Sequence, residues 1–217
     1  MKNQSITEAM LQFIEESPTA FHAAANVEAL LLENGFEKLE NLAEGALVPG
    51  GSYYTMQNGS AVLAVKIPEN PAKGFRIAAS HSDSPCFKIK EVPEMKVENT
   101  YVKLNVEKYG GMILSPWLDR PLSVAGRVFV AGKDGKPEAK LVNLKKDLLI
   151  ITNVAIHFNR EINNGFAYNP QTDMAPLMGL DQELSIKKLC AEAADVAEEE
   201  ICLLYTSPSP RDRTRSR

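Results

Sequence analysis

The chain has 217 residues and a formal net charge of −4, with 44% hydrophobic and 24% charged residues. At roughly 150 residues per domain, this length corresponds to one large or two small domains with a sizeable buried core. Its 13 glycines and 13 prolines are at the level of ordinary globular proteins, which excludes collagen, coiled-coil arrays and bulk disorder. No apolar run approaches the roughly 20 residues of a membrane-spanning helix, so we expect no membrane partner.

Cysteine usage and charge distribution bear on compartment and partners. The three cysteines are odd in number and widely spaced, which favours reduced thiols over a disulfide framework, and acidic residues interrupt the N-terminal stretch where a signal peptide would be apolar. We therefore expect a cytoplasmic protein. Four of its arginines lie within Ser207–Arg217, which leaves the rest of the chain acidic. Nucleic acid is accordingly not an expected partner.

Two helices are predicted at the start of the chain. Ser5, followed three residues later by Glu8, predicts a capping box, and apolar residues then recur at helical spacing to about Glu16. A second helix is predicted with Ser17 as N-cap, proline at its first position and a stop at Gly35.

The pattern then changes to that of strands. Asn58-Gly59 predicts a hairpin between residues 53–57 and 60–67, and the short apolar run Phe75–Ala79 is typical of a buried strand. Further strands are predicted over residues 86–90, 101–106, 122–130, 140–144 and 148–151. This order of elements predicts an α/β or α+β body with a β-rich second part.

The last part of the chain contains one more predicted helix, followed by a segment of very different composition. Apolar residues recur at helical spacing from Ile186 to Val196, whereas Thr206–Arg217 has no apolar side chain beyond its prolines. We expect a disordered tail there, with an arginine-rich RNA-binding tail as the functional alternative. A third interpretation is that the segment from about Cys202 derives from cloning or sequencing-adaptor DNA and is not native.

The first segment with candidate chemistry is Ser80–Cys86, at the end of the predicted buried strand, where α/β proteins place their sites. His81 can bind a metal through one ring nitrogen while Asp83 accepts a hydrogen bond from the other. One alternative is a loop-capping aspartate beside an ordinary histidine. Another is a nucleophilic Cys86 or serine with His81 as base, although the chain lacks a G-x-S-x-G elbow.

The second segment surrounds His157, which follows the apolar run 148–151 in unusually polar company that includes Asn159, Arg160 and Glu161. These side chains either satisfy loop backbone groups or hold a charged ligand. His22, within the second predicted helix, is interpreted as an ordinary helix histidine. The sequence contains neither a phosphate-binding glycine loop nor an H-E-x-x-H motif, so any site is assembled from distant segments.

Taken in order, these segments resemble the aspartyl aminopeptidase family of zinc metallopeptidases, metallopeptidase family eighteen. The segments that carry the resemblance are Ser17–His22, Ser80–Lys90, Trp117–Val128, Ala155–Thr172 and Pro176–Gly179. It extends from about residue 5 to Ile201, and an ordered series of matches is far more specific than any one of them.

The resemblance implies an α/β fold, with an incomplete zinc-aminopeptidase catalytic domain built on an α/β/α sheet and an inserted β-rich oligomerisation domain. Residues 1–92 would be the N-terminal part of the catalytic domain and residues 93–201 the inserted domain. Residues 202–217 would be a non-native, disordered tail.

The resemblance also implies a metallo-aminopeptidase that uses metal-activated water to remove N-terminal, preferentially acidic, residues from peptides. Its cofactors would be two Zn²⁺ ions, with Co²⁺ or Mn²⁺ as alternatives. His81 matches a metal ligand, and Asp83 matches the catalytic-site carboxylate that orients it. His157 matches a histidine that approaches a metal or substrate, often in a neighbouring subunit, and a homo-oligomer is expected.

In the family, the general-base glutamate and the other metal ligands lie downstream of the point where this sequence diverges. A catalytic zinc takes three protein ligands and a water, so we expect these 217 residues to be inactive by themselves. The alternative function is a non-catalytic oligomerisation module. A third possible function is nucleic-acid binding by a basic tail, and the four terminal arginines are the only feature that supports it.

Overall fold

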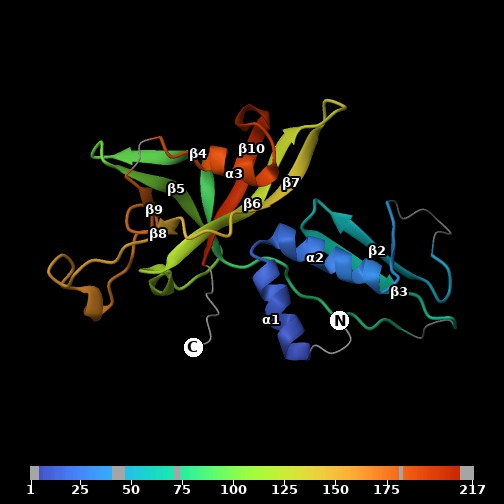
Figure 1. Cartoon of the computed structure of the whole chain (residues 1–217). Coiled ribbons are helices and arrows are strands. Elements are labelled where there is room, and N and C mark those ends of the chain that lie inside the picture. The colour runs from blue at the N-terminus through green and yellow to red at the C-terminus, as the bar shows by residue number, and fades with distance from the viewer. Residues whose placement is uncertain (1–4, 41–46, 71–73, 181–182, 211–217) are drawn as a thin grey trace. The chain divides into compact units, whose positions relative to one another are not determined.

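A computed structural model describes residues 5–40, 47–70, 74–180 and 183–210, the last four of these in backbone only (Figure 1). The chain forms two compact units, residues 1–84 and 85–217. Strand β4 (Cys86–Val97) belongs wholly to the second unit. The division into a catalytic part, residues 1–92, and an inserted domain, residues 93–201, stays a prediction. No helix within the described ranges is long and apolar enough to cross a membrane.

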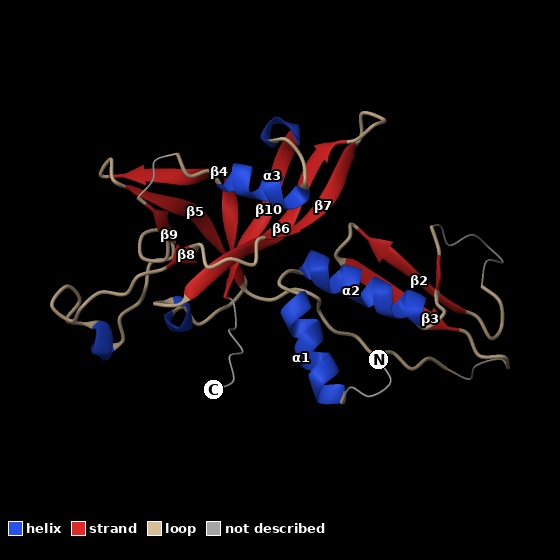
Figure 2. Cartoon of the chain, in the orientation of Figure 1, coloured by secondary structure: helices blue, strands red, loops and turns tan. Residues whose placement is uncertain are grey.

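The first unit combines two helices with a small sheet, as Figure 2 shows. Its elements are α1 (Ile6–Glu16), α2 (Ala20–Glu33), β1 (Glu37–Lys38), β2 (Ser52–Gln57) and β3 (Ala61–Lys66). β2 and β3 form the predicted antiparallel hairpin, with positive φ angles of 53° at Asn58 and 66° at Gly59, and β1 pairs parallel with β2. α2 packs against β3.

The helix ends follow local hydrogen bonding. The predicted capping box of α1 is confirmed, because the Ser5 hydroxyl accepts from the Glu8 N–H at 3.2 Å and the Glu8 carboxylate accepts from the Ser5 N–H at 2.8 Å. The predicted N-cap of α2 is wrong: Thr19, not Ser17, caps it, by accepting from the His22 N–H. Ser17 instead ends α1 as its C-cap.

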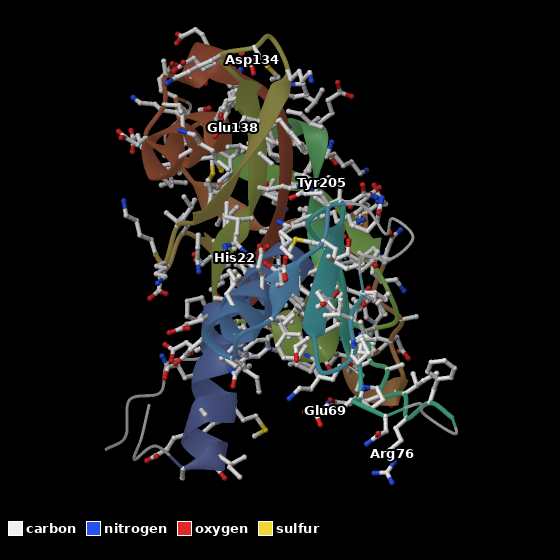
Figure 3. The ribbon with its side chains drawn as sticks, turned by 90° about the vertical axis from the view of Figure 1, so that its right-hand side faces the viewer. His22, Glu69, Arg76, Asp134, Glu138 and Tyr205 are labelled. Carbon is white, nitrogen blue, oxygen red and sulfur yellow. The ribbon has the colours of Figure 1, made fainter. Side chains whose placement is uncertain are left out.

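The predicted buried strand at Phe75–Ala79 is also wrong. These residues form no strand, and the side chains of Phe75 and Ile77 are 92% and 86% exposed. Arg76 between them extends away from the ribbon (Figure 3). A buried strand needs hydrogen-bonding neighbours along its edges, and within the described part of the first unit this segment pairs with none of β1, β2 and β3.

The second unit is a curled, antiparallel seven-stranded sheet in the order β10-β6-β8-β9-β5-β4, with β7 paired to β6. The strands after β4 are β5 (Tyr101–Tyr109), β6 (Pro121–Ala131), β7 (Pro137–Asn143), β8 (Leu149–Ile150), β9 (Leu177–Gly179) and β10 (Ile201–Pro210). Three short 3₁₀ helices, η1 (Ser115–Trp117), η2 (Ile162–Asn164) and η3 (Glu198–Glu200), lie in the connections. The β-rich character predicted for this part of the chain is confirmed.

The core of this unit lies inside the curl of the sheet. Phe87, Leu104 and Leu122 are fully buried, and Phe87 packs edge-on against Trp117 with ring centroids 5.0 Å apart. Helix α3 (Ile186–Ala194), predicted from its apolar spacing, packs against β7 and β10. Burial of these aliphatic and aromatic side chains is the main stabilising contribution.

The predicted disordered tail is partly wrong. Residues 201–210 form β10, which pairs antiparallel with β6 from Ile201 opposite Val130 to Pro210 opposite Leu122. An open strand edge presents unpaired backbone groups, and pairing with them needs no apolar side chain, which is why composition failed as a guide. Residues 211–217 of the tail lie outside the described residues.

Candidate functional site

His81 and Asp83 lie in the connection between β3 and β4, at the end of the first unit. Between them, the Ser82 hydroxyl donates to the backbone carbonyl of Ser60 at 2.7 Å. Ser60 belongs to the β2–β3 hairpin turn, so this bond ties the segment to the small sheet. Sequence reasoning missed this anchor, because the two residues are 22 positions apart and neither has a distinctive pattern.

The predicted contact between His81 and Asp83 is present. His81 Nδ1 lies 2.7 Å from the Asp83 carbonyl oxygen and 3.1 Å from its carboxylate Oδ1. Both oxygens accept hydrogen bonds and cannot donate them, so the hydrogen atom belongs on Nδ1. In the neutral imidazole the lone pair is then on Nε2, which has no hydrogen-bond partner among the described residues.

This arrangement suits metal binding by His81. The side chain is 80% exposed and that of Asp83 is 42% exposed, so the ring is open to solvent while its orientation is fixed. Metal-binding histidines characteristically donate their other ring nitrogen to a carboxylate or a carbonyl, and here both acceptors are present. The pair thus fits one ligand and its orienting group. Across the described ranges, no three His, Cys, Asp or Glu side chains gather closely enough to hold an ion.

The nucleophile alternative receives no support from this geometry. With Nδ1 held by Asp83, the base would be Nε2 of His81, and among the described residues no serine or cysteine side chain is hydrogen-bonded to Nε2. Cys86 is the first residue of β4 and half-buried. His22 is also structural, because its Nδ1 lies 2.8 Å from the Thr19 hydroxyl at the start of α2.

His157 belongs to the other unit, in the loop between β8 and β9. It lies in an exposed turn in which the Phe158 N–H donates to the Ala155 carbonyl at 2.9 Å. Some of the polar side chains near His157 form hydrogen bonds within the loop. The Asn164 side-chain amide donates to the Glu161 carboxylate at 3.2 Å. The first unit brings His81 and Asp83 together, and His157 is not part of that unit.

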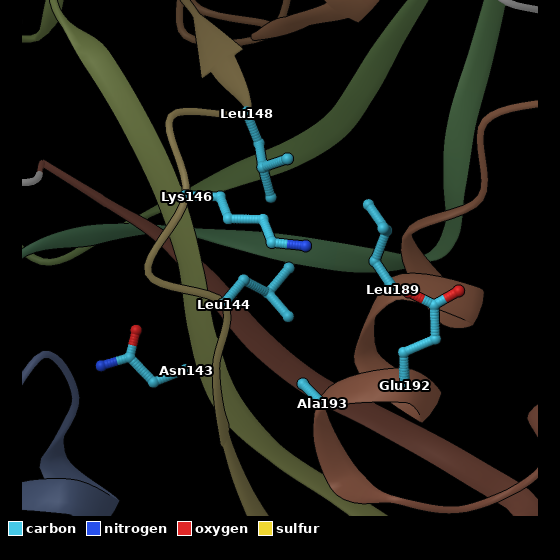
Figure 4. A pocket seen from close by; sticks show the side chains of 7 residues that line it. All are labelled: Asn143, Leu144, Lys146, Leu148, Leu189, Glu192 and Ala193. Atoms are coloured by element: carbon cyan, nitrogen blue, oxygen red, sulfur yellow. The ribbon is translucent and has the colours of Figure 1, made fainter.

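Two hollows in the second unit involve none of the predicted site residues. One of about 310 Å³ lies between the β7–β8 connection and α3, with Leu144 and Leu189 directed into it and Lys146 and Glu192 beside them (Figure 4). The other, of about 490 Å³, is lined mainly by apolar side chains, including Phe166. No sequence motif marked either hollow.

Comparison with known proteins identifies a family that the chain matches. Residues 13–204 match the model of the aminopeptidase I zinc metalloproteases (M18). A "Probable M18 family aminopeptidase 2" of Clostridium acetobutylicum is 46% identical over 184 residues, which are 83% of this chain and 42% of that protein. The chain therefore spans less than half the length of this relative.

Solved structures with the same fold include two fungal proteins. Chaetomium thermophilum mApe1 superposes with a TM-score of 0.84 and 28% identity, over 95% of this chain and 51% of its own. The S. cerevisiae mApe1 dodecamer superposes with a TM-score of 0.78 over 96% of this chain and 48% of its own, and at 21% identity that likeness concerns the fold alone. On the family match and the identity to the clostridial relative, the chain belongs to the M18 family of aminopeptidase I zinc metalloproteases.

Proposed function

We propose that the protein carrying these residues is a zinc-dependent aminopeptidase that removes N-terminal residues, preferentially acidic ones, from peptides. Family membership supports the class of reaction. The observation that carries the role of this chain is the hydrogen bonding of His81, whose Nδ1 is held by Asp83 so that Nε2 carries a free lone pair. The acidic preference rests on the family resemblance of the sequence.

His81 and Asp83 have different roles in this proposal. His81 binds one metal ion through Nε2, and Asp83 is a positioning residue that fixes the tautomer and the ring orientation of that ligand. Zinc, when bound, polarises the scissile carbonyl and lowers the pKa of its bound water toward about 7. Co²⁺ and Mn²⁺ also suit imidazole and carboxylate ligands, and two ions in the whole protein fit the family resemblance.

For these 217 residues alone we propose metal binding without turnover. A catalytic zinc is held by three protein ligands, whereas the His81–Asp83 pair supplies one ligand and its orienting group. Purified chain is therefore expected to bind Zn²⁺ weakly and to release no N-terminal Glu, Asp or Leu from chromogenic peptides.

The test is a Zn²⁺ titration by calorimetry, together with peptidase assays of the whole protein. His81→Ala is expected to abolish zinc binding by this chain, and Asp83→Ala to weaken it about 10–100-fold. His22→Ala, at the capped start of α2, is the control and leaves zinc affinity unchanged. In the whole protein, His81→Ala removes zinc-dependent release of N-terminal residues. Full turnover by that variant would refute the proposal.

We further propose that the whole protein forms homo-oligomers, and that the loop of His157 reaches a metal or a substrate in a neighbouring copy. The dodecameric state of S. cerevisiae mApe1 supports assembly. Exposed apolar side chains near His157 also favour it, since Phe158 is 84% and Ile156 48% exposed. Phe158→Ser is expected to lower the assembled mass in light scattering, whereas an unchanged mass would place the interface elsewhere.

A non-catalytic oligomerisation module is the alternative, and the same exposed loop favours it. Assembly of this chain without measurable zinc binding would support the module and contradict the metal-ligand role of His81. A cytoplasmic location is also proposed, because an odd number of widely spaced cysteines favours reduced thiols over a disulfide framework. Cell fractionation tests it.

A further inference from the structure

The smaller hollow of the second unit has walls from two segments that are distant in the sequence. It lies between residues 143–148, which lead from β7 to β8, and one face of helix α3 (Figure 4). Its volume of about 310 Å³ is at the small end of the roughly 300–1,000 Å³ that ligand pockets have. A hollow of this size suits a small molecule and not a folded partner.

The wall that leads from β7 to β8 is held to strand β6 by hydrogen bonds. The Leu144 and Leu148 N–H groups each donate to a backbone carbonyl of β6 at 3.0 Å. Between them, the Lys146 N–H donates to the hydroxyl of Ser123 on β6 at 3.3 Å, and Ser123 is buried. These bonds fix the direction in which each side chain leaves the connection. This wall is therefore formed in the absence of a ligand.

The opposite wall is a face of α3 that packing holds in place. Leu189, Glu192 and Ala193 are three and four positions apart, so they lie on one face of the helix. Ile186 and Cys190 of the same helix are fully buried in the core of the unit and hold α3 against the sheet. Because both walls are already ordered, a ligand pays little conformational entropy on binding.

The lining combines an apolar surface with two opposite charges. Leu144, Leu148 and Leu189 are half-buried and packed against the core, and each lines the hollow. Figure 4 shows the Lys146 side chain extending toward α3, where the Glu192 carboxylate lies beside Leu189. A cation and an anion are thus presented at the two walls of one apolar hollow.

Neither charged side chain has a partner among the residues that the structure describes. The Lys146 ammonium and the Glu192 carboxylate form no hydrogen bond or ion pair there, with each other or with a third residue. A lysine ammonium can only donate hydrogen bonds and an ionised carboxylate can only accept them. A ligand that satisfies both therefore carries an acceptor, a donor and an apolar group that covers the leucines.

A free amino acid with an aliphatic side chain has these three groups on one small molecule. Its carboxylate accepts hydrogen bonds, its ammonium group donates them, and its side chain is apolar. Glycine has no side chain to cover the leucines. Aspartate and glutamate would bring a second carboxylate against an apolar surface, where a charge loses hydration without compensation.

We propose that this hollow is a binding site for a free aliphatic amino acid such as leucine. Lys146 binds its carboxylate, Glu192 binds its ammonium group, and its side chain lies against Leu144 and Leu189. Binding requires neither zinc nor the cleavage of a peptide. The proposal is therefore independent of the peptidase function proposed for the whole protein.

The experiment is a ligand-observed NMR titration of the full chain with leucine up to about 20 mM. We expect a Kd of about 1 mM, because one small apolar side chain and two charges at the edge of a hollow supply limited binding energy. Glycine is expected to bind at least about tenfold more weakly, since it buries no side chain.

Two leucine analogues separate the contributions of the two charges. Leucinamide lacks the carboxylate and resembles the N-terminal residue of a peptide, whereas 4-methylpentanoate lacks the ammonium group. Each is expected to bind about three- to tenfold more weakly than leucine, because each gives up one charge-assisted hydrogen bond. Binding of leucinamide as tight as that of leucine would point to a peptide terminus as the ligand and contradict the proposal.

Substitutions assign each charge to its residue. Lys146→Met is expected to weaken leucine binding about three- to tenfold and to remove the preference for leucine over leucinamide. Glu192→Gln is expected to have the same effect on affinity and to remove the preference for leucine over 4-methylpentanoate. A purely structural role of either side chain would not change this selectivity.

Three further variants test the position of the site. Ala193→Leu places a larger side chain in the hollow at an exposed helix position, so it is expected to block leucine binding without disturbing the fold. Lys133→Met and Glu199→Gln are the matched controls, because both residues are exposed and neither lines the hollow. These two controls are expected to leave the Kd for leucine unchanged.

Several results would overturn the proposal. The absence of leucine binding up to about 20 mM would exclude the site at the affinity that its lining supports. Equal binding of glycine and leucine would mean that the apolar surface is not used. Unchanged selectivity in Lys146→Met and Glu192→Gln, or equal losses of affinity in the two control variants, would show that leucine binds elsewhere or by charge alone.

Discussion

The two units of the chain differ in how completely their apolar side chains are buried. In the second unit, Phe87, Leu104 and Leu122 are fully buried between strands that pair along their length. Among the described residues of the first unit, the buried hydrophobic side chains are those of Ala23, Ala24, Tyr53 and Tyr54. The candidate metal ligand His81 lies in this less buried unit. Its orientation therefore rests on local hydrogen bonds and not on packing.

The largest predicted effect compares two phenylalanines. Phe87 is fully buried against Trp117 in the second unit, whereas Phe75 is 92% exposed in the first. We expect Phe87→Ala to lower the free energy of unfolding by about 3–5 kcal/mol, because it removes buried apolar surface and leaves a cavity. Phe75→Ala is expected to change it by less than ~0.5 kcal/mol. Urea denaturation followed by circular dichroism measures both.

The same pair of variants tests the contrast between the units. Equal losses of stability would mean that Phe75 is buried in solution and that the exposed position of residues 75–79 is wrong. A large loss for Phe87→Ala alone would confirm that the core of the second unit dominates the stability of the chain.

Local sequence signals predicted most of the fold, and long-range partners account for the failures. The Ser5 and Glu8 pair specified its helix start because both hydrogen bonds close within three residues. Asn58-Gly59 specified a hairpin because its positive φ angles are intrinsic to those residues. The run at 75–79 was misjudged because an apolar pattern does not say whether a neighbouring strand is available. β10 was missed because its hydrogen-bonding partner, the backbone of β6, is distant in the sequence. The composition of residues 201–210 gives no sign of that partner.

In the candidate site, too, the contacts between residues close in the sequence were predictable and those between distant residues were not. The two-residue spacing of His81 and Asp83 was enough to predict that they meet, because a loop of that length brings a carboxylate back to the ring. The anchor from Ser82 to Ser60 was not predictable, because it depends on where the hairpin lies in space. His157 has no short-range partner that fixes its role, so its place in a site stays a prediction.

A second, smaller effect concerns polar burial in the first unit. The hydroxyl of Tyr54 donates to the Glu28 carboxylate at 2.9 Å, and Lys38 pairs with the same carboxylate at 2.9 Å. The hydrogen bond from Lys38, supported by that from Tyr54, lowers the pKa of Glu28. A lowered pKa stabilises the fold above the ordinary carboxyl range, and this contribution is lost as the pH falls through the folded-state pKa.

Tyr54→Phe is therefore expected to cost about 1–2 kcal/mol at pH 7, and progressively less as the pH falls through the folded-state pKa of Glu28 and its carboxylate becomes protonated. Tyr53→Phe is the matched control, because the Tyr53 hydroxyl accepts from the Val48 N–H at 3.3 Å and is hydrogen-bonded to no carboxylate of the described residues. Its cost should not depend on pH over this range. Urea titrations at pH 7 and at a series of acidic pH values measure both, and a pH-independent cost for Tyr54→Phe would exclude the link to Glu28.

The smallest effect compares two N-cap serines, one in each unit. Ser185 caps α3, whose residues Ile186, Cys190 and Ala191 are buried, whereas Ser5 caps α1, which has no buried residue. Ser185→Ala is expected to lower the free energy of unfolding by about 1 kcal/mol, because α3 unfolds together with the sheet it covers. Ser5→Ala should speed hydrogen exchange in α1 and leave global stability nearly unchanged, since a helix without buried contacts opens locally. If Ser5→Ala lowered global stability as much as Ser185→Ala, α1 would have to bury side chains in solution. The difference in burial between the two units would then not hold for α1.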